Sequence, residues 1–148
     1  MGVDAIWICH TCKEYFVPRL RAIFQSSFLY KVEKRRIKPK TLENFADRLQ
    51  EIFAPYKEAY YVDDMARSLR ILAAWLRKHE GHEIWLTTDA QVDFYDFNDY
   101  NKLYFIGLRN GKILTETEEE IRKRLLKLLD EDHDKMEEAS DLFGGVLS

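Results

Sequence analysis

The sequence predicts an α+β fold in which a small antiparallel or mixed sheet of about four strands packs with about four helices. Apolar residues recur at helical spacing in four segments, and short apolar or alternating runs, typical of strands, lie before and between them. Hydrophobic residues make up 46% of the 148 residues, which is enough to bury the core of a single domain spanning residues 1–148.

The first elements follow from these patterns. Residues 3–9, VDAIWIC, have the composition of a short buried strand. Residues 14–30 carry apolar side chains at helical spacing, and Pro18 suits the first turn of a helix because proline has no N–H to pair. Residues 31–40, KVEKRRIKPK, are expected to form a basic connector.

The middle of the chain predicts two helices and a strand. The first helix is expected over residues 41–53 with Thr41 as its N-cap. The second is expected over residues 63–81, opening on an aspartate cap and stopping at Gly81. Residues 82–88, HEIWLTT, are expected to form the strand that follows.

The last part predicts a hairpin and a helix. Residues 102–116 contain Asn110-Gly111, the pair that a type I′ turn requires. Residues 117–129 open with a capping-box pattern and carry leucines on one face, which core packing explains most simply and an oligomer interface explains as an alternative. Residues 131–148 are acidic and are expected to fray.

The cysteines and two of the four histidines predict a metal site. Cys9 and Cys12 close the first strand, while His79 and His82 lie where a helix leads into the second strand. If these strands are antiparallel neighbours, the end of one lies beside the start of the other, and all four side chains meet. Two thiolates and two imidazoles form a closed tetrahedral site for zinc, the cofactor that we expect. A CxxC turn also allows backbone amides to donate to the sulfurs.

The remaining histidines are expected to stay outside this site. His10 lies between the cysteines and should point outward, and His133 lies in the charged tail. The segment HEGHE does not fit the metalloprotease motif, because that motif places its histidines four apart on one continuous helix.

Two other interpretations of the cysteines stay open. The thiols could be buried without a ligand, with a histidine stabilised by the helix dipole. They could also form a redox dithiol or, in a hyperthermophile, a structural disulfide. A strand followed by CxxC and a proline-containing helix is similar to the start of thioredoxin, but no proline precedes a later strand, as the cis-proline loop of that family requires.

Together, CHTCKEY and WLRKHEGHEIWL resemble small uncharacterised prokaryotic proteins that have an N-terminal CHxCKEY knuckle and a helix ending in HxGH. The resemblance covers about a third of the chain, and it implies no known activity. It implies that the two pairs belong to one site.

Charge is unevenly distributed, although the net charge is only -3. The basic connector contributes six cations, and aromatic residues just before them could stack on bases of single-stranded nucleic acid. The sequence pI of about 5.8 favours a solvated connector instead. The candidate nucleic-acid-binding residues are Lys31, Lys34, Arg35, Arg36, Lys38 and Lys40.

These observations predict a zinc-stabilised binding or scaffolding module that is not an enzyme, self-associates and could bind another protein. One alternative is a metal-dependent hydrolase with an open zinc position and a base from the aspartate-rich residues 89–102; the other is a nucleic-acid-binding protein. No apolar run approaches the roughly 20 residues of a membrane span, and we expect a cytoplasmic protein. The sequence has only seven Asn and Gln residues, while 33% of its residues are charged, and this balance points to a thermophilic source.

Overall fold

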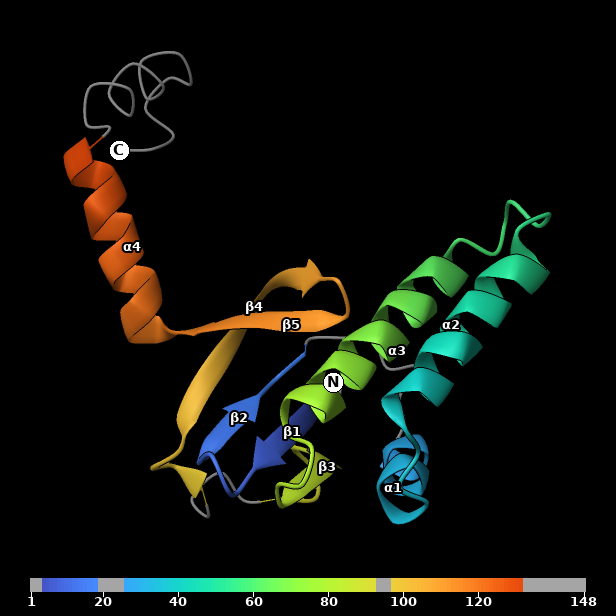
Figure 1. The fold of residues 1–148 in the computed structure, drawn as a ribbon, viewed down its shortest axis with the longest axis horizontal. Helices are drawn as coiled ribbons and strands as arrows, with labels where there is room; N and C mark the ends of the chain where they lie inside the picture. The colour runs from blue at the N-terminus through green and yellow to red at the C-terminus, as the bar shows by residue number, and fades with distance from the viewer. Residues whose placement is uncertain (1–3, 19–25, 93–96, 132–148) are drawn as a thin grey trace. The chain divides into compact units, whose positions relative to one another are not determined.

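The computed structural model describes residues 4–18, 26–92 and 97–131. These residues form four helices and a five-stranded mixed sheet (Figure 1), which confirms the predicted α+β class with one strand more than expected. The elements in chain order are β1 (Ala5–Cys9), β2 (Glu14–Phe16), α1 (Ser26–Lys34), α2 (Pro39–Phe53), α3 (Tyr61–Lys78), β3 (Ile84–Thr88), β4 (Asn101–Arg109), β5 (Lys112–Thr117) and α4 (Glu118–Glu131). Within the described residues, no helix combines the length and the apolar character that crossing a membrane requires.

The sheet has the strand order β3-β1-β2-β4-β5, and β1 is antiparallel to both of its neighbours, whereas β2 and β4 are parallel. Side chains alternate between the faces of a strand. Trp7 and Cys9 therefore lie in the main core, while Ile6 and Ile8 lie in a smaller cluster with Phe97. Burial on both faces explains why the first strand is a continuous apolar run.

Helix α3 supplies much of the main core. Its apolar stripe includes Leu69, Leu72 and Trp75, which belong to the same buried cluster as Trp7 of β1. Helix α2 lies beside α3 (Figure 1), and the guanidinium of Arg77 pairs with the carboxylate of Glu43 across the two helices. Hydrogen bonds from this guanidinium lower the pKa of Glu43, so the pair holds the C-terminal end of α3 against α2.

The predicted helix over residues 14–30 is wrong in its first part. Residues 14–16 form strand β2, because residues 10–13 turn the chain back so that β2 pairs with β1 in the register Trp7↔Phe16. This turn includes Lys13 at a φ of 56°. The basic connector is also partly wrong, because residues 31–34 belong to helix α1.

Two predicted helix starts are corrected. Helix α2 begins at Pro39, since proline is favoured at the first helical position, and Lys38 rather than Thr41 is its N-cap. Helix α3 begins at Tyr61, so Asp63 lies within its first turn, where a negative charge complements the helix dipole. The predicted hairpin is confirmed, with Asn110 and Gly111 both at positive φ, as a type I′ turn requires.

The chain divides into two compact units, residues 1–115 and 116–148. In the second unit, the capping box is confirmed, because Glu120 N–H donates to Thr117 Oγ1 (3.2 Å) and Thr117 N–H donates to Glu120 Oε1 (3.3 Å). Helix α4 has no buried residue within its own unit, so the core-packing expectation for this helix stays a prediction. The tail that was expected to fray lies outside the described residues after Glu131.

Candidate metal centre

The four predicted residues come together at one end of the sheet. Strands β1 and β3 are antiparallel, and Cys9 at the end of β1 pairs with Ile84 at the start of β3. Cys9 points to the side of the sheet that α3 covers, as its place in the main core shows. His79 follows the last residue of α3, so the helix end delivers its imidazole to this same corner.

The candidate ligand atoms are close enough to share one ion. One atom each from Cys9, Cys12, His79 and His82 lies within 4.8 Å of all the others. The distance from His82 Nδ1 is 3.6 Å to Cys9 Sγ and 3.4 Å to Cys12 Sγ. Cys12 Sγ also lies 3.7 Å from His79 Nδ1. This cluster could hold a metal ion.

Local backbone geometry fixes both pairs. The N–H of Cys12 donates to Cys9 Sγ (3.3 Å), the amide-to-sulfur bond expected of a CxxC turn. Between the histidines, Gly81 adopts a φ of 80°, which lets the chain reverse while His82 N–H donates to the carbonyl of His79 (2.9 Å). The left-handed glycine explains why these histidines converge although they do not share one helix.

Two further hydrogen bonds join the cysteine turn to the chain that follows the histidines. The N–H of His10 donates to the carbonyl of Glu83 (2.8 Å). The N–H of Glu83 donates in turn to the hydroxyl of Thr11 (2.9 Å). The corner is therefore held together by backbone contacts and does not depend on a bound ion alone.

The environment of His79 favours a neutral ligand. Its side chain is 2% exposed and packs on the indole of Trp75, with ring centroids 4.1 Å apart. Desolvation by burial, followed by the charge of Lys78 and the electrostatic influence of His82, lowers the pKa of His79 to about 4. The imidazole is therefore uncharged near neutral pH, which is the form that binds a metal. Its Nε2 is buried without a hydrogen-bond partner among the described residues.

Cys12 does not have the lowered pKa of a reactive thiol. Both cysteines are free thiols; Cys9 is buried and Cys12 is exposed. Desolvation, and next the hydrogen bond and charge of Cys9, raise the pKa of Cys12 above its ordinary value. Redox-active CxxC motifs instead have a lowered thiol pKa. This direction disfavours the redox interpretation.

His10 stays out of the cluster. Its Nδ1 lies 3.0 Å from the hydroxyl of Tyr100, and its ring meets Trp85 edge-on with centroids 4.3 Å apart. The side chain is half-buried between these aromatic residues. His133 lies outside the described residues.

The aspartate-rich segment contributes no ligand among the described residues. Asp89 accepts the backbone N–H of Asp4 (3.2 Å), and Asp99 is exposed. Residues 93–96, which include two further aspartates, lie outside the described residues. The metal cluster found in the described part of the chain therefore contains only sulfur and nitrogen donors.

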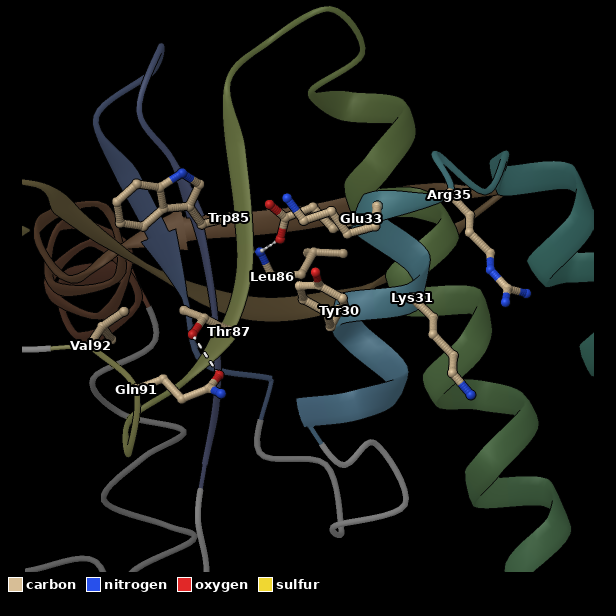
Figure 2. Close-up of a pocket in the computed structure, with 10 residues that line it drawn as sticks. Tyr30, Lys31, Glu33, Arg35, Trp85, Leu86, Thr87, Gln91 and Val92 are labelled. Carbon is tan, nitrogen blue, oxygen red and sulfur yellow. Dashed lines mark hydrogen bonds between the residues drawn. The ribbon is translucent and has the colours of Figure 1, made fainter.

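The six cations of the basic stretch lie elsewhere, on and after α1, and all are exposed. Sequence reasoning missed two groups. Trp75 packs against His79 and so forms one side of the site. Trp85 lines a groove together with cations of the basic stretch (Figure 2). The hydrophobic stripe of α3 signals the burial of Trp75, but no local pattern places Trp85 beside α1.

Comparison of the chain with protein-family models, with curated proteins and with solved structures found no match. The resemblance to CHxCKEY proteins therefore stays a prediction. The functional argument depends on the geometry of the site.

Proposed function

We propose that Cys9, Cys12, His79 and His82 bind one zinc ion and that the protein is a zinc-stabilised, non-catalytic binding or scaffolding module. Thiolate and imidazole together suit zinc, while the harder cations Mg²⁺ and Ca²⁺ take oxygen ligands. In the reducing cytoplasm, where we place the protein, free thiols persist as metal ligands.

The distances between sulfur and nitrogen carry this proposal. Zn–S bonds of about 2.3 Å and Zn–N bonds of about 2.1 Å, at tetrahedral angles, separate sulfur from nitrogen by about 3.6 Å. Three of the four sulfur–nitrogen distances in the cluster are 3.4, 3.6 and 3.7 Å. These three distances agree with the spacing expected around a tetrahedral zinc ion, which supports the proposal.

The number of donors argues against catalysis. Catalytic zinc sites commonly have three protein ligands and keep a fourth position for water. Here four donors fill the coordination sphere, and burial of Cys9 and His79 shields two of them from solvent. The ion would join β1 to the end of α3 and to the chain entering β3, so its role would be to stabilise this corner.

Cobalt substitution tests the donor set. Loading metal-free protein with Co²⁺ should produce intense visible absorption of tetrahedral cobalt and a thiolate-to-cobalt charge-transfer band, because two sulfurs and two nitrogens bind the ion. Cys12→Ser should weaken the charge-transfer band, and His10→Ala should leave the spectrum unchanged. A pale, octahedral spectrum from the unmodified protein would rule out the four-donor site.

We also propose that the protein self-associates through the leucine face of α4. Monomeric proteins rarely expose a contiguous apolar patch that has no function. The most exposed leucine of this face is Leu126, whose exposed fraction is 62%. The exposed leucines of this face are Leu125, Leu126, Leu128 and Leu129.

Charge complementarity favours a second copy of the chain, with the two helices antiparallel. The first turn of α4 carries Glu118, Glu119 and Glu120, and cations occupy residues 122–124. An antiparallel pair that brings the leucines of the two copies together is centred near residue 127, so the cations at 122–124 of each helix lie beside Asp130 and Glu131 of the other. The ion pairs within α4 are exposed, such as Arg122–Glu118, and break at little cost.

Changing Leu126 to Glu should convert the oligomer to a monomer, because each copy would bring a charge into an apolar contact. Light scattering should give a mass above 17.7 kDa for the unmodified protein and 17.7 kDa for the variant. Ile52→Glu is the matched control, since Ile52 of α2 is also half exposed. A monomeric unmodified protein would contradict the proposal.

A further inference from the structure

A groove of about 880 Å³ lies between helix α1 and strand β3 (Figure 2). The strand contributes Trp85, the helix contributes Tyr30, Lys31 and Lys34, and Arg35 comes directly after the helix. We propose that this groove binds single-stranded nucleic acid. The groove shares no residue with the metal cluster, so this inference goes beyond the zinc-stabilised module and does not depend on it.

The cations of the groove have no anionic partner. Among residues 4–18, 26–92 and 97–131, no ion pair involves Lys31, Lys34 or Arg35. By contrast, Arg70 and Arg77 on α3 are both paired with carboxylates. Glu33 also lines the groove, so the three cations and this carboxylate leave a net positive charge that is available to phosphate groups.

The aromatic rings of the groove are unusually exposed. Trp85 is 44% exposed, whereas Trp7 and Trp75, the other two tryptophans of the chain, are fully buried. Tyr30 is 61% exposed, and Lys34 Nζ lies 5.6 Å from the centre of its ring. Exposed rings beside cations are the arrangement on which unpaired bases stack.

The two kinds of contact are separated in space as a nucleic-acid strand requires. Figure 2 shows Trp85 on one side of β3 and α1 on the other, with Lys31 and Arg35 extending away from Trp85. The edge of His10 contacts Trp85 and limits the rotation of its indole. A nucleic-acid strand that crosses the sheet edge at β3 would have its phosphates near α1 and a base on Trp85.

Strand addition by a peptide is the competing use of this surface, because β3 is an edge strand. The groove disfavours it. Leu86 N–H, at the middle of β3, already donates to the carboxylate of Glu33 (3.0 Å), so helix α1 occupies the edge that a peptide would need. An acidic peptide would use the cations but would leave the two exposed rings without a role.

The intrinsic fluorescence of Trp85 provides the test. Adding an oligothymidylate of about ten nucleotides at low salt should quench the exposed tryptophan, because a base stacks on it. Trp85→Phe should abolish the quenching but retain binding, measured by anisotropy of a labelled oligonucleotide. Trp85→Ala should weaken binding on the order of tenfold or more, the range of lost base stacking.

Charge reversal tests the phosphate contacts. Lys34→Glu combined with Arg35→Glu should abolish binding and flatten its salt dependence. The matched control is Lys57→Glu combined with Arg109→Glu, because these two exposed cations lie outside the groove and the change in net charge is equal.

Three results would overturn the proposal. The first is no oligonucleotide binding by the unmodified protein at low salt. The second is equal loss of binding in the control pair, which would indicate attraction to net charge alone. The third is that polyglutamate binds as tightly as oligothymidylate and is insensitive to Trp85→Ala, which would indicate a site for acidic polypeptide.

Discussion

Cys12→Ser should remove the stabilisation that zinc provides and should make the protein melt at the temperature of the metal-free form. Zinc at a thousand times its dissociation constant adds about 4 kcal/mol to the free energy of unfolding. For a chain of this size, the loss corresponds to a fall of about 10 °C in Tm. Differential scanning calorimetry with and without zinc measures it.

Cys12 is the informative ligand to replace because its side chain is exposed, unlike that of Cys9. A serine at Cys9 would also bury a hydroxyl, which destabilises the core without any metal effect. The control is the metal-free unmodified protein, which should melt at the same temperature as the Cys12→Ser variant. If zinc left the Tm of the unmodified protein unchanged, the stabilising role of the site would be wrong.

Trp75→Ala should be the most destabilising single change in the core, by about 3–5 kcal/mol in urea unfolding. Trp75 is fully buried, stacks on Phe16 with centroids 5.6 Å apart and contacts Trp7 at 6.3 Å. The substitution removes these contacts and leaves a cavity. It also removes the ring against which His79 packs, so zinc should stabilise the variant less than it stabilises the unmodified protein.

Two variants separate these effects. Trp75→Phe retains an aromatic ring and removes an indole N–H that has no partner among the described residues. It should therefore lower the free energy of unfolding much less than Trp75→Ala does. Trp85→Ala removes an exposed indole and should cost less than about 1 kcal/mol. A cost below about 1 kcal/mol for Trp75→Ala would contradict the core described here.

The candidate metal centre could be predicted because its signals are local. CxxC and HxxH are recognisable by residue type, and the flanking strand and helix patterns placed both pairs near the ends of their elements. The convergence of the pairs depended on one assumption, that strands 3–9 and 82–88 are antiparallel neighbours, which the pairing of Cys9 with Ile84 confirms. The position of Gly81 indicated that the histidines do not share one continuous helix.

The parts that could not be predicted depend on long-range pairing. Residues 14–16 fit a helical pattern locally, but they pair with β1 on one side and with β4, more than 80 residues later, on the other. Apolar spacing contains no information on such partners. The groove was missed for the same reason, because Trp85 and α1 line one groove only after β3 has joined the sheet.

The zinc content of the purified protein tests the central claim most directly. Elemental analysis of protein prepared without chelator should find about one zinc per chain. Cys9→Ser, Cys12→Ser and His82→Ala should each reduce it, whereas His10→Ala should not, because His10 contacts Tyr100 and Trp85 instead. Less than about 0.2 zinc per chain, together with a Cys9–Cys12 disulfide in mass spectrometry, would contradict the metal site and favour a redox dithiol.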